Sequence, residues 1–455
     1  MAAATRPSPA FTLFEGFVTV HGLAVRPGEE WDGEEWAAVR CASKAAYRCG
    51  GGAFGQQLAD GLTLYVRRAA AAHPELLTSF LSIVLSDAAA SGIAAELGFP
   101  RKGLEAMAEI LIAHRQAIVL LLIFRYNCIN RCFYYIAYDS ADASLSVTPY
   151  LPRQIEAIYT SAPVPVRGAG GGDLALVLMA RLVCTPDVVR SRRLCVCAPA
   201  DGAAAGGAWR EKVHVFPKLY EPFSADVVFS LHGTVFWADL SQGVAYSDLD
   251  AGGNAAVDTV FVSLPDGHRI EYYPQQKDLP LKMRRTPVRD PAKMSRTMGC
   301  VEDAVKFVCI DDGHDPGNET AVKVLTLDLD RRVWEEDEGL SCPWNDLWEQ
   351  VVSMNAELRD VEPLEPQYPT LMPDGALFLL LPIVPEGGHP MDGNYYVCGF
   401  DMRSKSLRCF GQVHKYHTLS PVILPSDFFS CSPPPAEGSC QSAKYLEADV
   451  QSASR

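Results

Sequence analysis

A strand pattern that recurs five times constrains the fold of this sequence more than any other feature. Each copy begins with a continuous apolar run, continues after a polar or glycine-containing turn with a second apolar run that ends near an aspartate, and closes with a segment rich in Val, Phe or Trp. The leading runs begin at Ala117, Leu174, Thr234, Ala304 and Ala376, which are 57, 60, 70 and 72 residues apart. The pattern predicts one supersecondary unit that is used several times.

The apolar periodicity indicates how these units pack. The leading runs are apolar at almost every position, which is typical of strands with both faces covered, whereas the later runs alternate and indicate one solvated face. Each unit is therefore predicted to run from a buried inner strand to a more solvated outer strand. Radial stacking of small antiparallel sheets produces this gradient. We predict a mainly β fold, a β-propeller-like repeat of about six antiparallel blades; unrelated hairpins in one or two β-sandwiches are the alternative.

The repeats also suggest a division of the chain. Residues 1–61 are predicted to be an irregular region with strands, residues 62–429 the propeller-like domain, and residues 430–455 a disordered tail. A short helical segment is predicted near residues 91–114, because Ser91–Phe99 and Lys102–His114 carry apolar residues at helical spacing. Strands near the N-terminus are expected to complete a blade and close the ring.

Long loops are needed because the repeat exceeds the ~40–50 residues of compact propeller repeats. They are predicted at Asp201–Ala208, Asp266–Arg296 and Cys342–Tyr368.

Composition excludes several classes of protein. The chain has 455 residues, of which 48% are hydrophobic and 21% charged, and this balance is typical of a globular protein. Its net charge of −15 argues against general binding to nucleic acid or to anionic membranes. Apolar runs are far shorter than the ~20 residues that span a bilayer, and the first residues lack a secretory signal. We expect a cytoplasmic or nuclear protein, with organelle import as a weaker alternative.

No residue set has the spacing of a catalytic, cofactor or metal site. Cys195 and Cys197 share one face of a predicted strand, and none of the 14 cysteines forms the paired C-x-x-C arrangement of a structural zinc site. His414 and His417 have no ligand partner at suitable spacing, and the glycine run 168–172 precedes a strand rather than opening a helix. We therefore predict no catalytic residue, no cofactor-binding residue and no metal ligand.

One segment carries charge opposite to that of the whole chain. Between Lys277 and Arg296 there are seven basic residues and two acidic ones, and three prolines disfavour helix and central strand. Lys282, Arg284, Arg285 and Arg289 are the candidate protein-interaction residues. A basic exposed loop favours an acidic protein surface as partner or acts as a weak nuclear-import patch; a solvated linker between blades is the structural alternative.

Several motifs resemble those of a plant family called domain of unknown function 1618. They are the segment from His114 to Leu122, CFYYIAYDS with SLSVTPYLP, FWADLSQGVAYSDLD with FVSLP, VKFVCID, Trp344 with DLW, YPTLMPDGALFLL and FDMRSKSLR. The resemblance extends over roughly residues 62–416. The family has no established catalytic residues that could be transferred to this sequence. Its repeats are similar to propellers attached to plant F-box proteins, although no F-box helix bundle precedes the repeats here.

Two classes of function fit these observations. The first is a non-enzymatic protein-binding propeller or scaffold, because acids and histidines are scattered at strand ends without a motif. The second is a propeller enzyme with an active site at the channel mouth, since one fold supports unrelated chemistries. The resemblance adds a third alternative, a substrate-recruiting module of a ubiquitin ligase. Clustered Asp, Glu or His at the channel mouth with perturbed titration would favour the enzyme.

Overall fold

The described residues fold into β-sheets with few helices. The structure is a computed structural model and describes residues 11–23, 36–47, 53–68, 78–151, 157–160, 162–167, 174–182, 192–197, 209–212, 214–215, 223–249, 257–270, 291–311, 319–355, 358–383, 395–413 and 422–429. The prediction of a mainly β protein is confirmed. The tail 430–455 and the loop 201–208 lie outside the described residues.

The five predicted leading runs are all strands, and each begins at the predicted residue. They are β8 (Ala117–Tyr126), β13 (Leu174–Leu182), β18 (Thr234–Asp239), β22 (Ala304–Asp311) and β27 (Ala376–Pro382). Each lies in a different sheet.

Four sheets of four or five strands follow one another along the C-terminal two thirds of the described chain. The first contains β11 (Ala157–Thr160), β12 (Val164–Arg167), β13, β14 (Arg192–Cys197) and β15 (Arg210–Lys212). The second contains β17 (Val227–Leu231), β18, β19 (Gly243–Asp248), β20 (Val257–Ser263) and β16 (His214–Val215). The third contains β21 (Arg296–Val301), β22, β23 (Ala321–Asp328), β24 (Val333–Glu336) and β25 (Cys342–Pro343). The fourth contains β26 (Gln367–Leu371), β27, β28 (Tyr395–Asp401) and β29 (Ser406–Val413).

The leading strand of each unit is predicted to be the innermost strand, and this is wrong for the four smaller sheets. A short strand precedes each leading run and lies at the inner edge of its sheet: β12, β17, β21 and β26. These four strands pack side by side, β12 on β17, β17 on β21 and β21 on β26. Sequence reasoning missed them because four to six residues give too little periodicity to separate a strand from a loop.

An 11-stranded sheet holds the N-terminal part of the described chain together. Its main path is β3 (Ala37–Ala38), β5 (Leu62–Arg67), β6 (Thr78–Leu85), β2 (Phe17–His21), β7 (Leu104–His114), β8, β9 (Ile129–Asp139), β10 (Ser144–Pro149) and β4 (Ser43–Ala46). β1 (Phe11–Phe14) and β30 (Val422–Pro425) join it at β6. Strands that precede residue 62 therefore pair with strands that follow it. The helices α1 (Ala53–Asp60) and α2 (Asp87–Leu97) pack on each other beside this sheet.

The helix predicted over Lys102–His114 is wrong, because this segment is strand β7, whereas the first half of the predicted helical segment is helical in α2. Leu104, Ala108 and Ile112 are the buried positions of β7. Their spacing of four residues is a multiple of the strand period and also falls near one helical turn. Gly103, whose φ is +88°, separates β7 from the preceding turn.

Two of the predicted loops contain helices. The segment 342–368 includes α4 (Trp344–Met354), in which Leu347, Trp348 and Val351 are buried and which packs on β29. The basic segment ends in α3 (Pro291–Ser295), which Pro291 opens; proline fits the first helical position because the amide there has no helical partner. Residues 271–290 lie outside the described residues.

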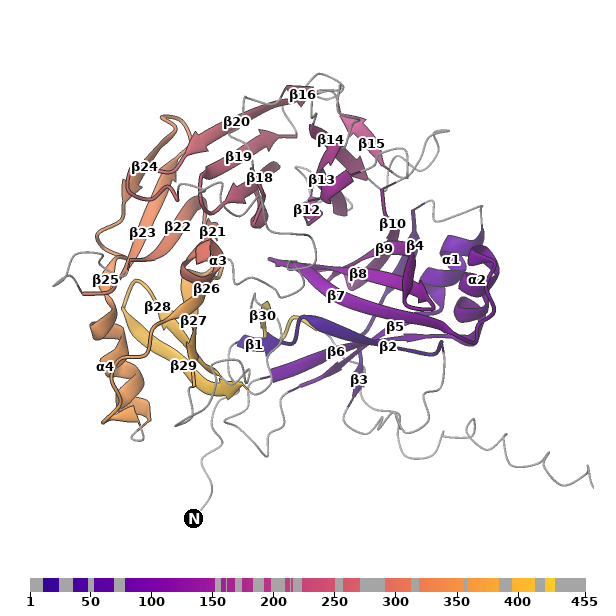
Figure 1. The fold of residues 1–455 in the computed structure, drawn as a ribbon, viewed down its shortest axis with the longest axis horizontal. Helices are drawn as coiled ribbons and strands as arrows, with labels where there is room; N and C mark the ends of the chain where they lie inside the picture. Colours follow the sequence, from indigo (N-terminus) through magenta and orange to yellow (C-terminus); the bar gives the residue numbers. More distant parts are fainter. Residues whose placement is uncertain are drawn as a thin grey trace, which may run out of the picture.

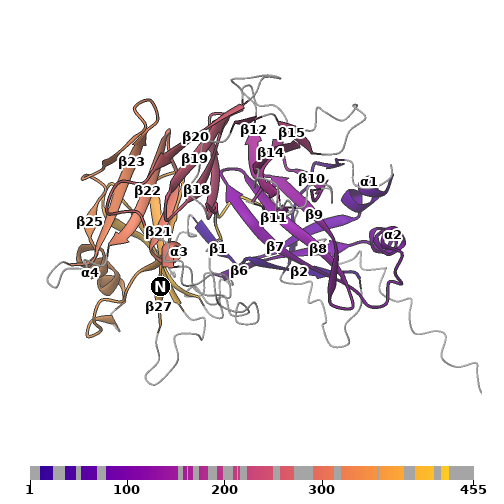
Figure 2. The ribbon, with the colours of Figure 1, turned by 45° about the horizontal axis from the view of Figure 1, so that its top comes forward.

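Hydrophobic cores lie between neighbouring sheets. Phe236 of β18 and Phe307 of β22 share one core, and Val324 of β23 and Phe400 of β28 share the next. Val177 of β13 packs with residues of both neighbours in another. Figure 1 shows the sheets following one another around an arc from β7–β10 to β27–β29, and Figure 2 shows β18–β20 beside β22 and β23. Each sheet depends on its neighbours for burial.

A two-stranded ribbon from the two ends of the described chain lies between the first and last sheets of this arc (Figure 1). β1 pairs antiparallel with β30, so that Phe11 lies opposite Pro425 and Phe14 opposite Val422. Leu13 and Ile423 belong to the core of β26–β28, whereas Phe14 and Leu424 belong to the core of the 11-stranded sheet. The two faces of this ribbon thus contribute side chains to two different cores.

We predict that the ribbon contributes strongly to the stability of the whole chain. Phe14 is 3% exposed and packs edge-to-face on Phe429, with ring centroids 5.5 Å apart, whereas Phe17 is 45% exposed. Phe14→Ala should lower the free energy of unfolding by about 3–5 kcal/mol, the usual cost of removing a buried phenyl ring. Phe17→Ala is the matched control and should cost well under half as much. Urea unfolding measures both; equal effects would contradict the role of the ribbon.

Candidate functional site

A large cavity lies where the inner turns of successive sheets converge. Its volume is about 1030 Å³, close to the upper limit of the usual range of ligand sites. The β7–β8, β17–β18, β21–β22 and β26–β27 turns supply most of its lining, together with the ends of β12, β1 and β30. The enzyme alternative considered from the sequence expects clustered Asp, Glu or His at such a place, so the lining residues test it.

Three of these turns share one construction. Arg115–Gln116, His232–Gly233 and Glu302–Asp303 are two-residue connections between an inner strand and the following leading strand. The first residue of each has positive φ, 52° at Arg115, 48° at His232 and 53° at Glu302. Left-handed backbone at a residue with a Cβ costs roughly 1–2 kcal/mol, and such strain is concentrated at functional sites.

The ion pair between Arg167 and Asp139 lies in the wall of the cavity. The Asp139 side chain is 2% exposed and ends β9, and its Oδ1 atom also accepts the Ala141 amide at 3.0 Å. Arg167 ends β12 in the neighbouring sheet. The pair therefore joins two sheets at the cavity, and removal of Arg167 would leave the buried Asp139 carboxylate without its ion pair.

His114 lies behind the same wall and links three strands. Its Nε2 atom is 2.9 Å from the Ser230 carbonyl oxygen and 3.3 Å from the Ser230 amide nitrogen. The Ser230 hydroxyl donates to the Pro165 carbonyl at 3.0 Å. Burial and, to a smaller extent, the Arg115 guanidinium lower the pKa of His114 to about 4. The imidazole is thus neutral at pH 7.

Acidic side chains at the mouth are mostly paired. Glu302 accepts a hydrogen bond from Arg403 at 2.7 Å, and Asp374 pairs with Arg408 at 2.6 Å. Arg408 also pairs with Asp401 at 2.5 Å. Hydrogen bonds from the Ser404 amide and from Arg408 lower the pKa of Asp401 to about 2. Arg403, in the turn after β28, thus joins the fourth sheet to a turn of the third sheet, whereas Arg408 of β29 pairs within the fourth sheet.

Three exposed side chains complete the mouth. Nε2 of His232 lies 3.1 Å from Asp303, and both side chains are more than 60% exposed. Arg115 is exposed and has no ion pair with any described residue. Phe11, Val166 and Leu174 add apolar surface. The mouth thus offers apolar area, one uncommitted cation and peptide groups at turns.

The perturbed histidine does not form a catalytic arrangement with its neighbours. Ser230 carries the one hydroxyl among the described lining residues. That hydroxyl donates its hydrogen bond to the Pro165 carbonyl oxygen rather than to the His114 imidazole. A nucleophile needs a base within hydrogen-bond reach of its own proton. Asp, Glu and His side chains do gather at the cavity, as the enzyme alternative expects. Several of them, however, form ion pairs or hydrogen bonds between neighbouring sheets.

Cysteines are placed in strands as expected. Cys195, Cys197, Cys309 and Cys398 are buried, and Cys409 is half-buried. Burial raises the pKa of Cys309 and of Cys409 to about 11, so both are thiols at neutral pH. Within the described ranges, no group of three or more His, Cys, Asp or Glu side chains could hold a metal ion, and no helix is long and apolar enough to cross a membrane.

The structure does not test the predicted interaction residues. Lys282, Arg284, Arg285 and Arg289 all lie in 271–290, outside the described residues. The last basic residue of that segment, Arg296, donates to the Leu240 and His268 carbonyls at 3.0 and 2.5 Å and therefore has a structural role. Sequence reasoning missed the cavity turns. The signal was present: each of three leading runs follows directly on two turn residues.

Comparison with known proteins supports the resemblance found in the sequence. The family described as "Protein of unknown function (DUF1618)" matches residues 237–378, which include the third and fourth repeats. The chain is similar to this family over these residues. No curated protein matches it.

Two solved structures share little with the chain. The WD40 domain of SCAP from fission yeast is 11% identical, over 71% of each chain, with a TM-score of 0.27. The tail fiber of Staphylococcus aureus phage P68 is 10% identical, over 78% of this chain and 81% of that one, with a TM-score of 0.13. Both scores are too low to carry an argument about fold or function.

We predict that His114 makes the protein sensitive to mild acid. The unfolded chain has a histidine pKa of about 6.5, whereas burial lowers the native pKa to about 4. Between these values the unfolded state binds more protons, so the stability contributed by neutral His114 is complete above about pH 6.5 and is lost as pH falls towards 4, by at most about 1.4 kcal/mol per pH unit.

Urea unfolding at several pH values tests this. His114→Gln keeps hydrogen-bonding atoms but does not titrate, so its stability should fall less steeply between about pH 6.5 and 4. His232→Gln changes an exposed histidine at the same cavity and should follow the wild-type curve. Parallel curves for wild type and His114→Gln would contradict the assignment.

Proposed function

We propose that this chain is a six-bladed propeller scaffold that binds a protein partner, without catalysis, at the cavity formed by its inner turns. Four blades are the four smaller sheets. The 11-stranded sheet supplies the other two: β7–β10 with β4, and β30, β1, β6, β5 and β3, with β2 pairing across the two groups. The ribbon of β1 and β30 then closes the ring, which removes exposed sheet edges.

The observation that carries the proposal is the convergence of turns from distant parts of the chain on one open cavity. Turns on a rigid scaffold are where binding residues are usually placed. The Arg167–Asp139 pair and the Glu302–Arg403 pair join these turns to their neighbouring sheets, so the surface is formed before any partner arrives. Such preorganisation lowers the entropy cost of binding.

The side chains at the mouth of the cavity favour a protein partner over a small substrate. Phe11 and Leu174 supply apolar area, and Arg115 supplies a guanidinium that forms no ion pair with the part of the chain that the structure describes. Arginine and aromatic residues are enriched in protein interfaces. The basic segment that contains Lys282, Arg284, Arg285 and Arg289 is a second contact for an acidic surface on the same partner, and a cytoplasmic or nuclear partner fits the composition.

Site-specific photocrosslinking tests the cavity. A photoreactive amino acid at Gln116, in the exposed β7–β8 turn, should capture a partner from cell extract. The matched control is Lys102, an exposed residue just before the other end of β7, roughly 35 Å away along a strand of this length. A reproducible partner that crosslinks at Gln116 and not at Lys102 is expected. Equal capture at both positions, or none at Gln116, would contradict the proposed face.

Charge reversal tests the basic segment. Replacing Lys282, Arg284, Arg285 and Arg289 by Glu should lower recovery of the crosslinked partner and remove part of its salt dependence, since exposed charges are screened beyond ~8 Å at physiological ionic strength. The melting temperature should change little, because each surface substitution costs within about 0.5 kcal/mol. Undiminished recovery, or unfolding of the variant, would make the segment a structural linker.

A further inference from the structure

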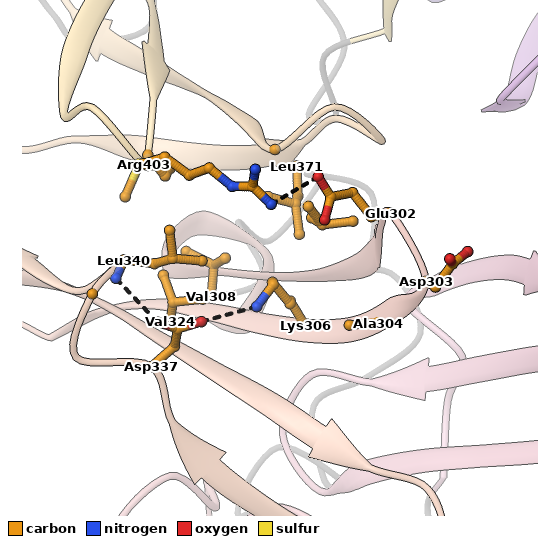
Figure 3. A pocket seen from close by; sticks show the side chains of 14 residues that line it. Glu302, Asp303, Ala304, Lys306, Val308, Val324, Asp337, Leu340, Leu371 and Arg403 are labelled. Atoms are coloured by element: carbon orange, nitrogen blue, oxygen red, sulfur yellow. Dashed lines mark hydrogen bonds and ion pairs between the residues drawn. The ribbon is translucent and has the colours of Figure 1, made fainter.

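A second pocket of about 590 Å³ lies between the third and fourth sheets, next to the cavity (Figure 3). Its walls are largely apolar: Val308, Val324 and Met402 are at most 2% exposed, and Leu340 and Leu371 are half-buried. Glu302, Asp303 and Gly375 are residues of the inner turns that line it at the cavity side. Pockets of this size and character take drug-sized molecules.

A lysine projects into this apolar pocket. The Lys306 side chain is only 11% exposed, and its ammonium group donates to Thr326 Oγ1 at 2.8 Å and to Asp337 Oδ2 at 3.0 Å. An ammonium group has three N–H donors, and no described residue takes the third. Lysine is almost never this buried unless its charge is matched. Asp337 matches the charge, so the third donor is available for a neutral acceptor.

The charges of the pocket decide which ligand fits. Arg403 and Glu302 form a pair on the opposite side of the pocket from Lys306 and Asp337, at 2.7 Å (Figure 3). Both cations are thus matched by a carboxylate, and Asp303 adds a further negative charge beside them. An anionic ligand would have to displace an acid from a cation. A neutral oxygen acceptor needs no such exchange.

We infer that this pocket binds a small neutral molecule with an apolar body and one carbonyl or ether oxygen that accepts the third N–H of Lys306. The apolar body lies between Val308, Leu340 and Leu371, and the open end faces Arg403 and Glu302. This site is separate from the partner face of the proposed function: it needs no protein partner, and its lysine is not part of the cavity lining.

Fluorescence titration with two probes tests the inference. Prodan is a neutral naphthalene with a ketone oxygen, and anilinonaphthalene sulfonate is an anion of similar size. Prodan should bind the wild-type protein at one saturable site with a shift of its emission to shorter wavelength. The anionic probe should bind this site at least about tenfold more weakly, because it must compete with Asp337 for Lys306.

Three variants assign the site. The double variant Lys306→Met, Asp337→Asn removes the ammonium donor together with the carboxylate that balances its charge. It should weaken Prodan binding by about tenfold or more. Ala304→Phe fills the lining at the edge of the pocket and should abolish the titration. Lys323→Met is the matched control: Lys323 lies on the neighbouring strand β23 and pairs with Asp311 at 2.6 Å outside the pocket. It should bind like wild type.

The outcomes are distinct from those of the crosslinking experiment. Absence of saturable Prodan binding by the wild type, or binding that both pocket variants retain, would overturn the site. Preference for the anionic probe would overturn the neutral class of ligand. Circular dichroism and the Lys323→Met control separate these results from loss of fold. Partner capture at Gln116 can succeed or fail whatever the titration shows.

Discussion

Burial of each sheet against its neighbours is the constraint on which the rest of this structure depends. A strand such as β18, buried at almost every residue, has two apolar faces and needs a cover on both. The cores shared between β18 and β22, and between β23 and β28, supply these covers in turn. The ribbon of β1 and β30 does the same for the first and last sheets, because Leu13 and Phe14 point into different cores. No sheet is complete alone.

This packing explains why charged groups gather at the inner turns. Inner strands that lie side by side bring together turns that are 60 or more residues apart in sequence. Polar side chains at such a crowded end lose part of their solvent, which is costly unless each charge finds a partner. Arg167 with Asp139, and Arg403 with Glu302, meet that requirement across sheet boundaries. Arg115 remains exposed instead, where water solvates it.

Much of the fold could be predicted because local sequence encodes it. The leading strands are continuous apolar runs, and the aspartates that end β9 and β28 accept amides two residues ahead, Asp139 from Ala141 and Asp401 from Arg403, which fixes the following turn. The inner strands and β7 could not be predicted, since their length or spacing fits two structures equally well. The cavity depends on contacts between turns of different repeats, which no single segment encodes.

The pocket and the cavity share a wall, and that wall links their chemistry. Glu302 lines both, and Arg403 holds it from the turn that follows β28. A ligand at Lys306 lies beside this ion pair, and a partner at the cavity mouth contacts the turn on which Glu302 sits. Any change that an occupant of one proposed site made in the position of Glu302 would alter the free energy of binding at the other site, and the coupling would be equal in both directions. The two proposed sites are therefore physically adjacent parts of one surface, joined by a residue whose left-handed backbone already carries strain.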